Sequence, residues 1–452
     1  MKRLKALQSI FMRSSGHNSP KGSSDLPESE FTPCVVAIAP DKFKGTLTAD
    51  EVAGEVGRAV AEAFPDAIVH LYPMADGGEG TAAVIAEKMN LQPANCAGHN
   101  SLMQPITIEY YQDETVCAVD SAAIIGLPML GDTPPDPWHS TSYGLGEFIA
   151  ARMAEGKSRL YVGIGGTASI DGGAGMLQAL GAVFRDVGGS AIGTHDNPVC
   201  AGDLWKIFST DLTAAALHAV RDSVTGIADV NLPLIPSTIE EVADMSHMSS
   251  LSFACQKGLP QQDLPQLYES LANYVAAIDA ALLPTSRRTA FNGAGGGVGY
   301  ALHRVLRCPC VAGAEFISGL YGIFDTTPPP DCLITGEGSF DAQSLQGKAT
   351  GTLLSQCAAR NIPAFVIAGR TSATTPAAAG ITETSPFMSP GTPLNHESAL
   401  TALRQALPSL LQSIRHSRER EDGGGGQCYA SNEEQTESEP EGRERGQWTE
   451  PK

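Results

Sequence analysis

The chain has 452 residues, which is enough for two or three domains. Hydrophobic residues make up 42% of it and glycines number 48, a composition typical of a globular, glycine-rich α/β protein and not of a disordered chain. The formal net charge of −20 disfavours a nucleic acid partner, because an acidic surface repels phosphate backbones. No apolar run approaches the roughly 20 residues that cross a bilayer, so we expect no membrane partner.

Both ends differ in composition from the middle. Residues 1–33 are basic and serine-rich, with no acid before Asp25. This composition is compatible with a disordered extension of a cytoplasmic protein or with a targeting peptide for mitochondria or another organelle, and the sequence leaves both open. Residues 416–452 are predicted to form a disordered acidic tail, because they hold too little apolar surface to offset the entropy of ordering.

Between the ends, predicted strands alternate with predicted helices. Residues 34–40 (CVVAIAP) form a continuous apolar run, as a buried parallel strand does, and residues 48–64 follow with helical spacing and Thr48 as N-cap. Residues 67–74 are predicted to form the next strand. Further strands are predicted over 115–121, 159–165, 309–316, 331–336 and 363–369, and further helices over 144–155, 174–180, 266–282, 299–305, 350–360 and 396–414. The alternation predicts an α/β fold of parallel sheets with helices on both faces.

Glycines gather directly after these strands, beside ionisable residues. The loops are Asp41-Lys42-Phe43-Lys44-Gly45, Asp76-Gly77-Gly78-Glu79-Gly80, and residues 165–175, 292–299 and 335–341, with Lys348 after the last. Open α/β sheets bind ligands at the carboxyl ends of their strands, and glycine there lets backbone N–H groups approach a phosphate or carboxylate. Carboxylates can hold Mg²⁺ or orient a hydroxyl, and lysines can neutralise phosphate. The loops therefore predict a phosphoryl-transfer or anion-binding enzyme.

Two other interpretations of the same loops compete with this one. A Gly-Gly pair often forms only a tight turn, and an acid beside it often only caps a helix. Gly-rich loops also occur in dinucleotide-binding oxidoreductases. That class is disfavoured here, because the first βα unit lacks GxGxxG with an acid about 20 residues later, and the phosphate-loop pattern GxxxxGK[ST] is absent as well.

Five segments occur in the same order as in a known family. They are APDKFKGTLTADEVA, PMADGGEGT, GIGGTASIDGGAGMLQALGA, GAGGGVG and LITGEGSFDAQSLQGKA. In these motifs the chain resembles the bacterial-type glycerate 2-kinase family. The resemblance implies two α/β domains: a Rossmann-like domain from residues 34–90 plus 300–415, built from both ends of the globular chain, and a second α/β domain inserted at residues 91–299. It also implies ATP and Mg²⁺ as cofactors and D-glycerate as the small-molecule substrate, giving 2-phosphoglycerate; the oligomeric state stays open.

We assign roles to the loop residues as a hypothesis. Phosphoryl transfer needs positioning and charge neutralisation more than covalent chemistry. Catalytic roles are predicted for Asp76, Asp171 and Lys44, with one of the two aspartates accepting the proton of the acceptor hydroxyl or orienting it. Substrate contacts are predicted for Asp41, Lys348, Asp229, Gly165 and Gly166. Nucleotide contacts are predicted for Gly172, Gly173, Gly295, Gly296, Gly297, Gly336 and Gly338, and Mg²⁺ ligands for Glu79, Glu337 and Asp341.

Some positions depart from the family pattern. Ser339 stands where the family has Arg, and Leu232 and Leu145 also interrupt its motifs. A hydroxyl does not replace a planar guanidinium that holds a carboxylate or phosphate. Two alternatives therefore stay open: a kinase for another small hydroxy acid, and a catalytically degenerate relative with a binding or regulatory role.

Overall fold

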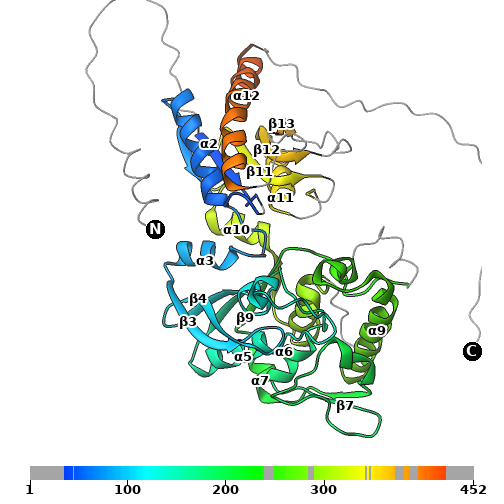
Figure 1. Ribbon diagram of the computed structural model, residues 1–452. Coiled ribbons are helices and arrows are strands. Elements are labelled where there is room, and N and C mark those ends of the chain that lie inside the picture. The colour runs from blue at the N-terminus through cyan, green and yellow to red at the C-terminus, as the bar shows by residue number, and fades with distance from the viewer. Residues whose placement is uncertain are drawn as a thin grey trace, which may run out of the picture.

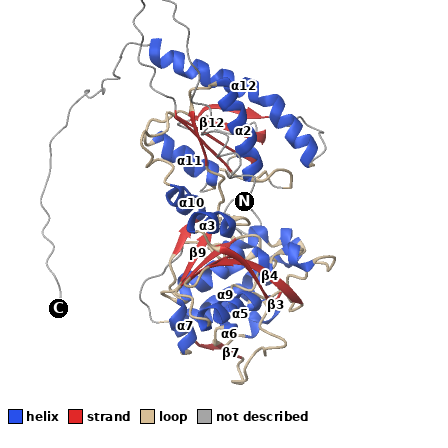
Figure 2. Ribbon diagram, turned by 90° about the vertical axis from the view of Figure 1, so that its left-hand side faces the viewer, coloured by secondary structure: helices blue, strands red, loops and turns tan. Residues whose placement is uncertain are grey.

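The computed structural model describes residues 35–43, 45–238, 249–282, 290–341, 344–345, 348–371, 381–386 and 395–423. The predicted extension at 1–33, the tail from 424 onward and Lys44 lie outside these residues. Strands and helices gather into two bodies (Figure 1), and a view from the side shows the same division (Figure 2).

A five-stranded sheet carries both ends of the globular chain. Its strand order is β13-β12-β11-β1-β2, and all neighbouring strands pair in parallel. The strands are β1 (Val35–Pro40), β2 (Ile68–Leu71), β11 (Cys332–Phe340), β12 (Ala364–Thr371) and β13 (Ile381–Pro386). The predicted α/β class, with one sheet built from both ends of the chain, is confirmed.

A six-stranded sheet is built from the middle of the chain, in the order β10-β9-β6-β5-β4-β3. Its strands are β3 (Gln92–His99), β4 (Pro105–Gln112), β5 (Val116–Asp120), β6 (Arg159–Ile164), β9 (Val224–Ala228) and β10 (Cys310–Ala312); β7 (Val183–Arg185) and β8 (Ser209–Asp211) form a separate pair. The prediction of parallel sheets is wrong at one edge of this sheet, where β4 pairs antiparallel with β3 and with β5. From β5 onward the strands pair in parallel. β3 and β4 are partly exposed along their length, so they lack the continuous apolar run of a strand covered on both faces.

Helices connect and cover the strands. The described α-helices are α2 (Ala49–Ala63), α3 (Thr81–Met89), α4 (Ala122–Ile125), α5 (Tyr143–Ala154), α6 (Ala174–Ala179), α7 (Ala215–Val220), α9 (Leu264–Ala281), α10 (Gly313–Tyr321), α11 (Ala349–Ala358) and α12 (His396–Gly423). Short 3₁₀ segments are η1 (Leu127–Leu130), η2 (Ala201–Lys206), η3 (Ser250–Phe253), η4 (Cys255–Lys257), η5 (Gln261–Asp263) and η6 (Ala294–Gly297), and η7 (Tyr300–Val305) is a π-helix.

Alternation along β1 sends side chains to both faces of the five-stranded sheet. Val36 and Ile38 join an apolar cluster with α2 and α12, while Ala37 and Ala39 join another with α3, α10 and α11. Both faces are therefore covered, which explains why β1 is an unbroken apolar run in the sequence. α2 begins at the predicted N-cap Thr48, where a capping box forms.

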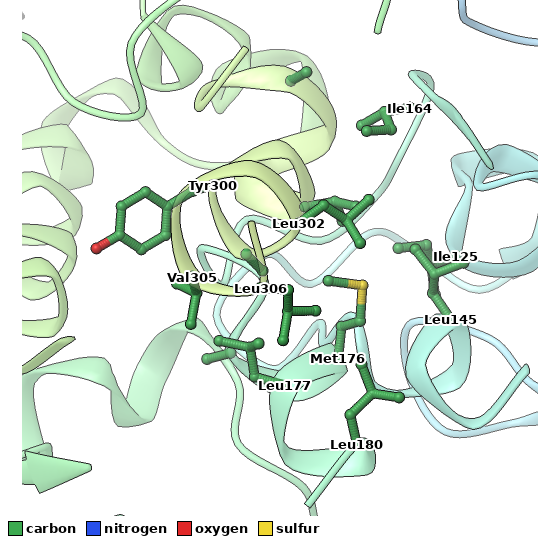
Figure 3. Close-up of a cluster of buried hydrophobic side chains, with 14 of the residues drawn as sticks. Ile125, Leu145, Ile164, Met176, Leu177, Leu180, Tyr300, Leu302, Val305 and Leu306 are labelled. Carbon is green, nitrogen blue, oxygen red and sulfur yellow. The ribbon is translucent and has the colours of Figure 1, made fainter. Parts of the chain in front are cut away.

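The six-stranded sheet packs one face on a large core of its own. α5, α6, α9 and η7 contribute to this core. Figure 3 shows Ile125, Leu145, Met176 and Leu302 gathered below Ile164, the last residue of β6. The core thus fixes the end of β6, and the glycine-rich loop that follows it starts from a rigid support.

α3 and α10 lie between the two sheets (Figures 1 and 2). Their buried side chains share one apolar cluster with Ala37 and Leu333 of the five-stranded sheet and with Ala118 and Ile227 of the six-stranded sheet. The two sheets are therefore joined by a common core and not only by the connecting chain.

The strand predicted over residues 309–316 is wrong in its second half. β10 ends at Ala312, and α10 begins at Gly313. The buried residues Ala314, Ile317 and Ser318 beyond this point follow helical spacing. Ala314 and Ile317 join the apolar cluster that α3 and both sheets share.

The domain boundaries at residues 90, 299 and 415 stay predictions. β10 belongs to the six-stranded sheet, although it lies beyond residue 299, where the inserted domain is predicted to end. α12 continues to Gly423, past the predicted start of the tail at 416. Among the helices in the described ranges, none has the length and apolarity that crossing a membrane requires.

Ile227→Ala should weaken the join between the two sheets. The Ile227 side chain is fully buried in the shared cluster, so its truncation leaves a cavity, and we expect the free energy of unfolding to fall by about 2–5 kcal/mol. Urea-induced unfolding followed by circular dichroism measures this. Ile68→Ala on β2, where the side chain is 40% exposed, is the matched control and should cost less than about 1 kcal/mol. Equal losses in the two variants would contradict the shared core.

Candidate active site

The loops after β1 and β2 meet at the carboxyl edge of the five-stranded sheet. Lys42 Nζ donates to the backbone oxygen of Glu79 at 2.7 Å and lies 3.9 Å from Asp76 Oδ1. Gly78 N donates to the same Asp76 oxygen at 3.3 Å. Lys42 therefore holds a carboxylate and a glycine-rich turn together while its side chain stays 30% exposed, within reach of a ligand.

The loop over residues 76–80 also lies against the six-stranded sheet. A Cβ on Gly77 would lie 2.5 Å from the carbonyl carbon of Ala228, and Gly77 has a φ of +105°, so only glycine fits this approach. From the end of β5, the Asp120 carboxylate accepts from Gly80 N at 2.8 Å and from Ala82 N at 2.9 Å, which caps α3. The carboxyl ends of both sheets therefore meet at this loop.

Asp229, which follows β9, lies beside the loop. A Cβ on Gly165 would lie 2.6 Å from Asp229 Oδ2 and 2.8 Å from Gly78 Cα, so the three residues are close neighbours. Burial, and then the charge of Asp76, raise the pKa of Asp229 to about 7, against the lowering effect of two lysines. Among the described residues, the buried Oδ1 of Asp229 has no hydrogen-bond partner.

A second acidic group forms where β1 and β11 end. Asp41 is buried, and burial followed by the charge of Asp76 raises its pKa to about 7, with a smaller contribution from Glu337. Burial also raises the pKa of Glu337, and the ammonium of Lys348, 4.0 Å from Glu337 Oε2, opposes that shift. Carboxylates that raise one another's pKa favour a cation beside them.

Asp171 is placed differently from the other predicted site acids. It is fully buried, and its carboxylate accepts from Ser142 N and Ser142 Oγ at 2.8 Å, from Gly175 N at 3.0 Å and from Gly173 N at 3.1 Å. These four hydrogen bonds join the start of α5 to the start of α6. The geometry gives Asp171 an organising role in the loop after β6, and its catalytic assignment stays a prediction.

The predicted nucleotide-binding glycines are close together but pack mainly on each other. Gly172 N donates to Gly296 O at 3.1 Å, and a Cβ on Gly297 would lie 2.3 Å from Gly172 Cα. Gly173 likewise packs on Gly297, and Gly295 packs on Ile164. Gly336 and Gly338 belong to β11, where a Cβ on Gly336 would lie 1.9 Å from Ile367 O.

These contacts require glycine for the approach of one backbone to another, and the nucleotide role of the glycines stays a prediction. Gly165 and Gly166 differ, because they border Asp229 and Ala122 at the meeting of the sheets. The substrate contacts predicted for these two glycines therefore lie where a small ligand could reach the acids and lysines.

The three predicted Mg²⁺ ligands come from two parts of the chain. Glu79 is exposed in the loop beside Lys42, whereas Glu337 lies in β11 and Asp341 directly after it. In the described part of the chain, no group of three or more His, Cys, Asp or Glu side chains could hold a metal ion. Their role toward Mg²⁺ stays a prediction, as does that of Lys44, which is outside the described residues.

Sequence reasoning missed two lysines. It named Lys44 and not Lys42, although both follow β1, and Lys42 is the one seen beside Asp76. Lys257, in η4, is buried and affects the pKa of Asp229. It stands in the stretch FACQKGL, which resembles the family's FGPQKGA with altered residues. Because it follows no predicted strand, the search for ionisable residues at strand ends gave it no role.

The chain matches the sequence profile of the glycerate kinase family over residues 36–417. It belongs to the glycerate kinase family. The family resemblance carried by the five motifs is thereby confirmed. Membership implies use of ATP, since the family is one of kinases.

Individual members of the glycerate kinase family agree with this placement. The chain is 31% identical to the glycerate kinase of Bacillus subtilis (strain 168) over 337 residues, which are 74% of this chain and 84% of that protein. It is 31% identical to the glycerate 2-kinase of Escherichia coli (strain K12) over 316 residues, 69% of this chain and 79% of that protein. The crystal structure of a candidate glycerate kinase 2 from Salmonella typhimurium LT2 matches with a TM-score of 0.66 at 27% identity, covering 86% of this chain and 100% of that one.

Asp171→Asn should lower stability more than an ordinary surface change does. The amide places an NH₂ group against N–H donors that now point at a carboxylate, so we expect the free energy of unfolding to fall by about 2–4 kcal/mol. Asp196→Asn, at a fully exposed side chain, is the control and should stay within about 0.5 kcal/mol of the parent. Chemical denaturation measures both, and an unchanged midpoint for Asp171→Asn would argue against the organising role.

Proposed function

We propose that this chain is an ATP-dependent glycerate kinase that transfers the γ-phosphoryl group to D-glycerate and forms 2-phosphoglycerate. The observation that carries the proposal is the meeting of three carboxylates, Asp41, Asp76 and Asp229, with Lys42 at the carboxyl ends of two sheets. The pair of Glu337 and Lys348 lies beside this group, since Glu337 acts on Asp41. Phosphoryl transfer needs lysines against phosphate charge and a carboxylate near the acceptor hydroxyl. Relatives named as glycerate kinases support the choice of substrate.

The residues present fit a nucleotide with Mg²⁺. Mg²⁺ in kinases is usually held by one or two carboxylates together with phosphate oxygens and water, so a cage of three protein ligands is not required. Glu337 and Asp341, near Lys348, are the pair we assign to the ion, and Glu79 is the third candidate. Bound there, the ion would neutralise charge on the transferring phosphate.

The chain's own residues supply the rest of the chemistry. Lys42 and Lys348 are exposed enough to contact phosphate or the carboxylate of the hydroxy acid. The backbone of Gly165 and Gly166, next to Asp229, would border the small substrate and limit the water around it. An aspartate accepts the proton of the acceptor hydroxyl as the bond to phosphorus forms. Asp171 suits this role poorly, because its carboxylate is already fully hydrogen-bonded. The candidates are therefore Asp76 and Asp229, where the two sheets meet.

A catalytically degenerate relative is the second candidate, because Ser339 replaces the family's arginine. Ser339 is exposed on β11, and Arg370 is its register partner on the adjacent strand β12. Register partners of parallel strands carry their side chains on the same face of a sheet. Arg370 could therefore supply a guanidinium near the position of Ser339, which favours the active enzyme.

ADP release should depend on D-glycerate when the purified chain is given ATP and Mg²⁺. L-Glycerate and L-lactate serve as controls for stereochemistry and for other small hydroxy acids, and conversion of the product by enolase identifies 2-phosphoglycerate. ATP binding with no turnover on any acceptor would support the degenerate relative. Turnover with another hydroxy acid and not with D-glycerate would reject D-glycerate as the substrate but support the kinase activity.

Lys42→Met should lower kcat/KM for D-glycerate by about 100-fold, because it removes a positive charge at the phosphate site and frees the loop over residues 76–80. Lys206→Met is the matched control. Like Lys42, Lys206 forms an ion pair with one carboxylate, that of Asp203, but it lies on η2, so its loss should leave kcat/KM unchanged. Equal effects of the two substitutions would argue against a specific role for Lys42.

A further inference from the structure

Lys257 is a buried lysine with no role in the proposed kinase chemistry described above. Its side chain comes from η4, and the residue is only 7% exposed. Nζ donates to Thr167 Oγ1 at 2.9 Å and to Ser169 O at 2.7 Å, both in the loop after β6. A Cβ on Gly296 would lie 2.8 Å from the same Nζ. One ammonium group thus joins η4, the loop after β6 and the glycine turn of η6.

Charge interactions connect this ammonium to the candidate active site. The groups that act on Lys257 are Asp229 and Asp171, and both favour its charged form, although burial is stronger and lowers its pKa to about 8. Asp171 is already satisfied by four hydrogen bonds. Asp229 has an oxygen without a hydrogen-bond partner among the described residues, so its charge depends on its neighbours.

Three charged groups act on Asp229. Asp76 disfavours its ionised form, and Lys42 and Lys257 favour it. Lys42 is occupied by the Glu79 backbone and Asp76 and is partly in water, whereas Lys257 is enclosed by protein. A buried charge acts through a lower effective dielectric than an exposed one. Lys257 therefore leaves one positive charge acting on Asp229 when a phosphate group draws on Lys42. Its hydrogen bonds to Thr167 and Ser169 also fix the loop whose Gly165 lies against Asp229.

We propose that Lys257 is a positioning residue for phosphoryl transfer, which keeps Asp229 ionised and fixes the loop after β6 against it, so that Asp229 accepts the proton of the acceptor hydroxyl. The proposal rests on the kinase function proposed above. Asp76 is the weaker acceptor, because Lys42 and Gly78 N already bind its Oδ1.

The O–H bond of the hydroxy acid breaks and its proton moves to the Asp229 carboxylate. The electron pair left on that oxygen forms the new bond to the γ-phosphorus of ATP. The bond from this phosphorus to the β–γ bridging oxygen breaks, and its electron pair leaves with ADP.

Lys257→Met should move the acid limb of the kcat/KM profile to higher pH. Asp229 acts only when ionised, so activity is lost as pH falls through its pKa of about 7. Removing the ammonium raises that pKa, and we expect a shift of about one pH unit, with a fall of about fivefold in kcat/KM at pH 7. Lys257→Arg keeps the charge and should leave the limb in place, even if kcat falls.

Lys257→Gln separates charge from hydrogen bonding, because it keeps donors for Thr167 and Ser169 and loses the charge. It should shift the acid limb as Lys257→Met does. It should also restore any free energy of unfolding that the Lys257→Met variant loses. Lys206→Met is the control and should shift nothing. A limb that stays in place in folded Lys257→Gln would overturn the proposal, since the limb would then belong to another group, such as Asp41.

A substrate-free measurement keeps the test independent of the kinase function. The difference in unfolding free energy between the parent and Asp229→Asn, followed against pH, reports the pKa of Asp229. Because that pKa is raised on folding, the parent gains stability relative to Asp229→Asn as pH falls below about 7, and loses this gain as pH rises through it. When both proteins also carry Lys257→Gln, this loss of relative stability should occur at higher pH. An unmoved transition would reject the proposal, whereas absent turnover in the parent would reject only the function.

Discussion

The close approach of Gly77 to the end of β9 is the constraint on which the site depends. No side chain fits between residue 77 and Ala228, so the loop after β2 touches the second sheet directly. This contact brings Asp76 near Asp229 and Gly78 near Gly165. A bulkier residue at position 77 would separate the acids contributed by the two sheets, and neither sheet alone carries the full set of charges.

The same approach concentrates negative charge. Asp41 and Asp229 both have a pKa of about 7, far above the ordinary value for an aspartate, and Asp76 contributes to both shifts. Carboxyl groups of this kind stabilise the fold fully only when protonated, so the native state is less stable at neutral pH than its packing would allow. Cationic ligands and the lysines of the site offset that repulsion, which links ligand binding to stability.

Much of the fold could be predicted from local sequence. β1, β6, β11 and β12 are covered on both faces, so each contains an apolar run in the sequence. Glycine-rich stretches at or after strand ends marked Asp41 beside β1, Asp76 after β2 and Glu337 within β11. The antiparallel strands β3 and β4 were not predicted, because partly exposed strands have a weak hydrophobic pattern in the sequence. The separate parts played by Asp171 and Lys257 depend on partners far away in sequence, such as Ser142 and Thr167, which local patterns do not contain.

The position of β11 in the five-stranded sheet has a consequence for biosynthesis. β1 pairs with β11, and Val35 N donates to Asp331, 296 residues along the chain. The six-stranded sheet, in contrast, is complete at Ala312. On a ribosome the middle of the chain can therefore fold while β1 still has only β2 as a neighbour. The folded middle, with α3 and α10 packed on it, then offers a finished surface on which β11 can complete the five-stranded sheet. Nascent chains halted before residue 332 would carry β1 with one edge unpaired, as a binding site for chaperones.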